Sequence, residues 1–230
     1  MLRGYLGKIV NQSPKKNSCT IFTGGCNFKC PFCCYPRLVN NHLSIEKTPI
    51  DELIINLKYR AKDINEIVFA GGDPFIHDKL FAILKRIKRM NKSIKITTNG
   101  YFPNLLEQAL DSGLIDTVLM DIKTSLPKYP DAVGCTLDIS RIKASIDIIM
   151  KKAPVYEFRT TVVPGFVEER DILQIAELLD GATHYSLYPL SSRKLLKPEY
   201  RKILPKTKAY LKNYAEIASR KIGSVTIKKF

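Results

Sequence analysis

Four of the chain's six cysteines lie within the short stretch from Cys26 to Cys34. Cys26, Cys30 and Cys33 follow the spacing Cys-x3-Cys-x2-Cys on a loop that starts with two glycines. Thiolates at such a spacing can converge on one iron-sulfur cluster. A cubane cluster has an iron at each of its metal corners, so three thiolates leave one iron open to a ligand from outside the protein. The loop is therefore a candidate redox metal centre.

Two other interpretations of these cysteines stay open at this point. A structural zinc site needs a fourth nitrogen or sulfur ligand, and Cys34 or His42 can supply it. A disulfide needs an oxidising compartment. The first ten residues lack a continuous apolar stretch with a small-residue cleavage site, and no apolar stretch approaches the roughly 20 residues that cross a bilayer. We therefore expect a cytoplasmic protein without membrane contact, in which cysteines bind metal rather than pair.

The 230-residue chain carries a net charge of +15. Its basic residues are dense over residues 85–95 and again from Arg193 to the C-terminus. Such runs can dock an acidic partner or nucleic acid, or they can form the solvated outer faces of helices. Aromatic residues are not interleaved with the basic runs as they are in proteins that bind single strands, which disfavours nucleic acid.

Strands and helices alternate along the chain, and they must position the cysteine loop. Short apolar runs that end in glycine, proline or polar residues predict strands, and apolar residues at helical spacing predict helices between them. The predicted strands cover 19–23, 66–70, 93–98, 117–122, 155–163 and 184–190, with a final strand-like piece at 224–227. The predicted helices cover 49–57, about 78–90, 103–112, 140–152, 169–179 and about 206–220, and residues 124–137 are expected to be irregular.

This alternation predicts an α/β fold with a parallel sheet and right-handed crossovers. A full eight-unit barrel typically needs about 250 residues, so we expect a partial (β/α)6 barrel of the TIM type. We expect one domain over residues 1–230, with its core at about 17–190 and a short C-terminal helix and strand extension at about 191–230.

Parallel sheets place ligands at the carboxyl ends of their strands, and polar or glycine residues follow several of the predicted strands. One strand leads into Gly71-Gly72-Asp73, and the next leads into Asn99. Paired glycines allow close backbone approach to a ligand, and a carboxylate accepts hydrogen bonds from an ammonium group. We therefore expect these residues to share one site with the cysteine loop.

Three charged residues lie at the ends of the following two strands. Asp121 and Lys123 are two apart on one strand, so their side chains share a face and can hold opposite charges of one zwitterionic ligand. Arg159 lies on the next strand, and its planar fork suits a carboxylate or a partner's backbone. The alternative uses of these charges are simple ion pairs, between Asp121 and Lys123 or between Arg159 and Glu157.

The cysteine loop resembles the signature of the radical S-adenosylmethionine (radical SAM) enzymes, in the form Cys-x3-Cys-x-Phe-Cys with Phe32 before the last cysteine. The resemblance implies that Cys26, Cys30 and Cys33 hold a [4Fe-4S] cluster, whose open iron takes the amine and carboxylate of SAM. It also implies that Phe32 belongs to the cofactor site.

The run Gly71-Gly72-Asp73-Pro74 resembles the family's Gly-Gly-Glu-Pro motif, which binds the ammonium of SAM, although aspartate is one methylene shorter. The pair Asp121 and Lys123 resembles the Asp-x-Lys of glycyl-radical-enzyme activating proteins.

With the turn at Asn99 and the strand around Arg159, residues 19–180 resemble archaeal-type activating proteins of anaerobic ribonucleoside-triphosphate reductase. The resemblance implies a glycyl radical enzyme as partner, with that reductase as the first candidate, and a small acidic flavodoxin or ferredoxin as electron donor. Cys19 and Cys135 are isolated, so an auxiliary cluster has no ligands.

Two alternative functions stay open. A small-molecule radical SAM enzyme similar to 7-carboxy-7-deazaguanine synthase would have the same cofactor chemistry. A zinc-stabilised basic module that binds nucleic acid would have none of it.

Overall fold

The computed structural model describes residues 4–5, 18–40, 48–60, 64–191 and 195–229. One eight-stranded sheet runs through them in sequence order, from β1 to β8. Strand β1 pairs antiparallel with β2, and every later neighbour pairs in parallel. The strands are β1 (Gly4–Tyr5), β2 (Ser18–Thr23), β3 (Glu66–Gly71), β4 (Ser93–Thr98), β5 (Thr117–Asp121), β6 (Val155–Val162), β7 (Tyr185–Pro189) and β8 (Val225–Ile227).

Helices connect the parallel strands. They are α1 (Pro36–Asn40), α2 (Ile50–Arg60), α3 (Leu80–Lys88), α4 (Pro103–Asp111), α5 (Tyr129–Val133), α6 (Ile139–Lys152), α7 (Glu169–Leu178) and α8 (Lys208–Ala218), with 3-10 turns η2 (Pro74–Ile76), η3 (Leu126–Lys128) and η4 (Pro198–Lys202). The prediction of a partial parallel α/β barrel is confirmed, and the predicted strand at 224–227 lengthens the sheet as β8.

Two short helical stretches of the structure were not predicted from the sequence. The sequence predicts irregular structure over residues 124–137, but they form η3 and α5. Both are short, proline at the first turn suits a helix start, and Gly134 ends α5 in the left-handed conformation at φ 66°. Helix α1, which follows the cysteine loop, is also too short to leave a periodic apolar pattern.

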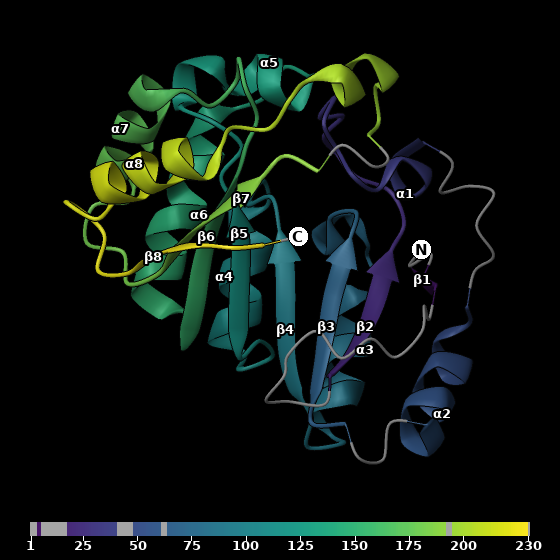
Figure 1. The fold of residues 1–230 in the computed structure, drawn as a ribbon. Coiled ribbons are helices and arrows are strands. Elements are labelled where there is room, and N and C mark those ends of the chain that lie inside the picture. The colour runs from purple at the N-terminus through teal and green to yellow at the C-terminus, as the bar shows by residue number, and fades with distance from the viewer. Residues whose placement is uncertain (1–3, 6–17, 41–47, 61–63, 192–194, 230) are drawn as a thin grey trace.

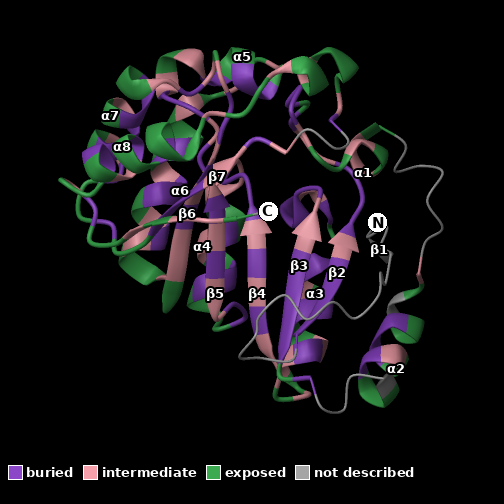
Figure 2. Cartoon of the chain, in the orientation of Figure 1, coloured by how far each residue is buried: buried purple, intermediate pink, exposed green. Residues whose placement is uncertain are grey.

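Helices α3, α4 and α6 lie together behind the sheet in Figure 1, and within the described residues no helix covers the front of β3, β4 and β5. Burial alternates along β4 and β5, where each intermediate residue is followed by a buried one (Figure 2). The buried side chains, such as Ile94, Ile96 and Met120, pack into the core with the helices. The alternating residues on the other face, such as Thr97 and Leu119, keep partial exposure.

This uncovered face is largely polar. In the register of β5 against β6, Leu119 lies beside Glu157, and Asp121 lies beside Arg159. All four residues are on the same face of the sheet because alternate residues of a strand share a face. A closed barrel fills its interior with branched apolar side chains, whereas here the inner face is hydrophilic and half-exposed. None of the described helices is long and apolar enough to cross a membrane.

Candidate active site

The cysteine loop directly follows β2 and is fixed to two later segments. The Gly25 N–H donates to Leu38 O over 2.7 Å, which ties the loop to α1. The Lys29 N–H donates to Val133 O over 2.8 Å, which ties it to α5. The short helices that were not predicted from the sequence therefore hold the loop in place.

The loop also meets the end of β3 at very close range. The Gly72 N–H donates to Thr23 O over 2.8 Å. A Cβ atom at Gly72 would lie 1.6 Å from Gly25 O, which no contact tolerates. Gly71 adopts φ 107°, a conformation that side chains disfavour. The paired glycines are thus required where the loop after β3 touches the cysteine loop.

The three predicted cluster ligands lie near one another in this loop. Cys30 is 7% exposed, whereas Cys26 and Cys33 are partly exposed. The pKa of the Cys30 thiol is raised to about 12, mainly by burial and in smaller part by the neighbouring Cys26 and Cys33, while the Lys123 charge acts to lower it. Burial likewise raises the pKa of the Cys26 thiol to about 11. Thiolates at these positions need a bound cation, because metal coordination deprotonates a thiol that burial would keep neutral.

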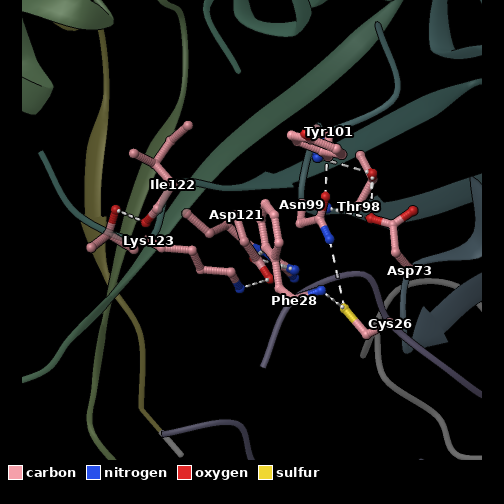
Figure 3. Close-up of polar contacts among 12 residues, drawn as sticks. Cys26, Phe28, Asp73, Thr98, Asn99, Tyr101, Asp121, Ile122 and Lys123 are labelled. Carbon is pink, nitrogen blue, oxygen red and sulfur yellow. Dashed lines mark hydrogen bonds and ion pairs between the residues drawn. The ribbon is translucent and has the colours of Figure 1, made fainter. Parts of the chain in front are cut away.

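The Cys26 sulfur already accepts two weak hydrogen bonds. The Phe28 N–H lies 3.4 Å from Cys26 Sγ, and the Asn99 side-chain nitrogen lies 3.7 Å from it (Figure 3). Hydrogen bonds to the thiolate sulfurs are one of the means by which proteins tune iron-sulfur clusters. The Asn99 side chain thus touches the cysteine loop, whereas its predicted role in cofactor binding stays a prediction.

The residues fit an iron-sulfur cluster better than a single metal ion. Among the described residues, no three His, Cys, Asp or Glu side chains lie close enough to hold one metal ion. Thiolates of a cubane each bind a different iron, so they need not meet at one point. Cys34 is exposed, and His42, the other candidate zinc ligand, lies outside the described residues. The assignment of Cys26, Cys30 and Cys33 as cluster ligands stays a prediction that this arrangement supports.

Asp73 lies in the turn after β3 and is 2% exposed. Its carboxylate accepts three hydrogen bonds, from the Phe75 N–H at 2.9 Å, the Thr98 hydroxyl at 2.8 Å and the Asn99 N–H at 2.7 Å. Burial nevertheless raises the pKa of Asp73. This carboxylate joins the ends of β3 and β4, as Figure 3 shows. A contact between Asp73 and SAM stays a prediction.

Asp121, Lys123 and Arg159 form one ion cluster at the end of β5 and beside the middle of β6. Lys123 Nζ lies 3.0 Å from Asp121 Oδ2, and two nitrogens of Arg159 lie 2.7 and 2.9 Å from Asp121 Oδ1. Burial alone would raise the pKa of Asp121, but the two cations hold it below its ordinary value. Burial would lower the pKa of Lys123, and the Asp121 charge raises it instead.

The structure decides between the alternative ion pairs. Arg159 pairs with Asp121, whereas Glu157 lies 3.7 Å from Lys228, beyond β8. The interpretation in which Arg159 pairs with Glu157 is therefore wrong, because the register places Asp121 directly beside Arg159. The Lys123 charge also lowers the pKa of Cys26, Cys30 and Cys33, so the ion cluster faces the cysteine loop.

Phe32 is buried, and its ring centroid lies 5.7 Å from that of Phe166. Its place in the cofactor site stays a prediction, since these contacts show a packing role.

Two tyrosines near the ion cluster were missed by the sequence analysis. The Tyr129 hydroxyl accepts from the Lys123 N–H at 3.3 Å and lies 3.5 Å from Asp121 O. The guanidinium carbon of Arg159 lies 6.0 Å from the ring centroid of Tyr188. No spacing signal marks Tyr129, because it lies in a segment expected to be irregular, and Tyr188 is hidden in an ordinary strand pattern.

A model of the radical SAM superfamily matches residues 20–179 of the chain. The chain belongs to the radical SAM superfamily. Members of this superfamily use a [4Fe-4S] cluster and SAM, so this radical SAM protein has both as cofactors.

Relatives cover this radical SAM chain to different extents. A Methanocaldococcus jannaschii protein named "Putative glycyl-radical enzyme activating enzyme" is 30% identical over 99% of this chain and 97% of its own length. A 7-carboxy-7-deazaguanine synthase of Aquifex aeolicus is 38% identical over 33% of each chain. The Escherichia coli coproporphyrinogen III oxidase structure, described as a radical SAM enzyme, superposes with a TM-score of 0.65 at 13% identity, over 91% of this chain and 54% of its own. That last likeness concerns the fold alone.

Proposed function

We propose that this radical SAM enzyme activates a glycyl radical enzyme, and that the partner is an anaerobic ribonucleoside-triphosphate reductase. The observation that carries the activase proposal is the full-length similarity to the M. jannaschii protein, which covers 99% of this chain. The reductase is favoured by the sequence resemblance over residues 19–180. An uncovered polar sheet face beside the site also suits a segment of a large partner.

Cys26, Cys30 and Cys33 would hold the cluster in a loop that backbone hydrogen bonds fix from two sides. When bound there, the cluster would supply one electron for the cleavage of SAM, and the net result would be methionine, 5'-deoxyadenosine and a glycyl radical on the partner. The protein contributes ligation, orientation and the exclusion of water.

The ion cluster would bind the amino acid end of SAM. SAM carries an ammonium and a carboxylate, and Asp121 can meet the first while Lys123 and Arg159 meet the second. In the structure Lys123 and Arg159 each pair with Asp121, at 3.0 and 2.7 Å. Binding would exchange internal ion pairs for pairs with the ligand, so the charges are never left uncompensated.

The backbone at the end of β3 and the Asn99 turn would complete the SAM site. Gly71 and Gly72 leave the backbone bare of side chains there, and Asn99 bridges Asp73 and Cys26 through its N–H and its amide. Asp73 is proposed to contact SAM as well, in addition to joining the two strand ends.

The ligand assignment is tested by two alanine variants. Cys30→Ala should abolish cluster assembly and SAM cleavage after anaerobic reconstitution, because a buried ligand is lost. Cys135→Ala is the matched control: its sulfur lies 3.8 Å from Asn27 O on the cysteine loop, but it has no proposed role. Equal loss in both variants would undo the assignment.

The partner is tested by mixing the reduced, SAM-loaded enzyme with a candidate reductase and recording electron paramagnetic resonance. A glycyl radical signal that requires both proteins and SAM is the expected result. SAM cleavage without such a signal would favour the second candidate, a small-molecule enzyme similar to 7-carboxy-7-deazaguanine synthase, which the match over 33% of this chain supports.

A further inference from the structure

The two basic runs of the sequence differ in the structure. In the first run, Arg86 lies 2.6 Å from Asp51, Lys88 lies 2.8 Å from Asp116 and Lys95 lies 3.0 Å from Glu66. These ion pairs join α3 and β4 to neighbouring elements. Much of the positive charge in residues 85–95 is therefore neutralised within the fold.

The second run contains a segment that lies against the cysteine loop. The Leu196 N–H donates to Cys33 O over 2.9 Å, and the Lys197 N–H donates to Pro31 O over 2.9 Å. In Figure 1 this yellow-green segment passes beside the purple loop that precedes α1. We call residues 195–202 the basic segment. Arg193 and Lys194 lie outside the described residues.

Aromatic stacking fixes the basic segment on the site. The ring centroids of Tyr200 and Phe166 lie 5.9 Å apart with an interplanar angle of 6°, and Phe166 in turn contacts Phe32 of the cysteine loop. The segment thus has a defined position relative to the cluster ligands, rather than only a sequence position near them.

The cations of the basic segment point to solvent. Lys197, Arg201 and Lys202 are exposed, and within the described part of the chain none of them forms an ion pair, while Glu199 is the one acidic residue of the segment. Lys29, on the cysteine loop itself, is also exposed. Exposed cations therefore outnumber exposed carboxylates in the basic segment beside the cysteine loop.

We propose that Lys197, Arg201 and Lys202 form the docking surface for the electron donor, a small protein with an acidic surface and a one-electron redox group. Electron transfer through protein weakens steeply with distance, so a donor must dock beside the cluster. Opposite charges steer such encounters and fix their orientation. In this step the donor loses one electron, the cluster gains it, and no covalent bond forms or breaks.

The location of these cations favours a redox partner over nucleic acid, since nothing in SAM chemistry requires nucleic acid at the cluster loop. The inference rests on the radical SAM chemistry of the proposed function, and it holds whether the substrate is a partner glycine or a small molecule.

The test compares two triple charge reversals. The docking variant carries Lys197→Glu, Arg201→Glu and Lys202→Glu. The matched control carries Lys85→Glu, Lys143→Glu and Lys151→Glu, which reverse exposed cations on α3 and α6 and change the net charge equally. Iron content is measured in both, so that all rates refer to loaded cluster.

Purified reduced flavodoxin is mixed with each protein, and the loss of cluster absorption is followed at low and high salt. The docking variant should be reduced about tenfold or more slowly at low salt and should show little salt dependence, whereas the control should behave as the unchanged protein. Equal reduction rates in the two variants would overturn the proposal. If the docking variant is reduced slowly and the control is not, but no glycyl radical forms on the reductase, the docking surface is supported and only the proposed partner is rejected.

Discussion

Asp73 and Asp121 both lie near the cysteine loop, one after β3 and the other at the end of β5. Asp73 is 2% exposed, and its three hydrogen-bond donors are neutral groups. The Asp121 side chain is 29% exposed and is flanked by Lys123 and Arg159. Both residues occupy the position where parallel strands place ligands, so position alone assigns them the same role. Their partners distinguish a carboxylate that joins two strand ends through neutral donors from one that is paired with two cations.

The largest expected effect is on the Asp73 side, at Gly72. Gly72→Ala would place Cβ 1.6 Å from Gly25 O, so the turn after β3 and the cysteine loop must separate. We expect most iron binding to be lost after anaerobic reconstitution, measured by iron content and by absorption near about 400 nm.

Gly113→Ala is the control for that variant. Gly113 adopts φ 62°, and a Cβ atom there would have nothing within 4 Å, so alanine adds backbone strain of about 1 kcal/mol without a clash. Full iron content in Gly72→Ala would show that the close approach is not needed to hold the loop.

The next effect compares the two carboxylates directly. Asp73→Asn replaces an acceptor of three buried donors by an amide, and we expect it to lower the free energy of unfolding by about 2 kcal/mol. Asp121→Asn should cost about 1 kcal/mol or less, because its partners are partly exposed, but it should weaken SAM binding more than Asp73→Asn does. Denaturant unfolding gives the free energy of unfolding of each variant, and titration with SAM gives the SAM affinity of each variant. The comparison fails if Asp121→Asn loses more stability than Asp73→Asn, or if Asp73→Asn loses more SAM affinity than Asp121→Asn.

A smaller effect is expected from Lys123→Ala. We expect SAM affinity to fall about tenfold while iron content stays the same, since a charge-assisted contact is removed and no ligand is changed. Lys88→Ala is the control, because Lys88 pairs with Asp116 away from the site. Unaltered SAM affinity in Lys123→Ala would count against its proposed role.

The smallest effect is on pH dependence, and its sign differs between the two carboxylates. Asp121 has a pKa below the ordinary value of about 4, so it stabilises the fold above that value and loses this contribution as pH falls through its lowered pKa. Asp73 has a raised pKa, so its contribution is complete below about pH 4 and is lost as pH rises through the raised value. Unfolding free energies of Asp73→Asn and Asp121→Asn between about pH 3 and 7, each relative to the unchanged protein, should therefore slope in opposite directions.

The alternation of strands and helices could be predicted because each element carries its own apolar period. The strand Ser93–Thr98 was predicted at its observed bounds, since turn residues stand on both sides of an alternating run. The donors to Asp73 could not be predicted, because Thr98 and Asn99 lie on another strand. The partner of Arg159 could not be predicted either, because it depends on the register of β5 against β6. Residues that meet only through register or through short helices such as α5 leave no local pattern.

The division of the sheet into a helix-covered face and an uncovered face also bears on how such an enzyme can change its specificity. Side chains such as Thr97 and Leu119 project from the uncovered face, so they can be replaced without repacking the core behind the sheet. Contacts such as that between Gly25 and Gly72 allow no such freedom. Substitutions that suit a new substrate can therefore accumulate on the uncovered face of the sheet, while the contacts between the cysteine loop and the end of β3 stay unchanged.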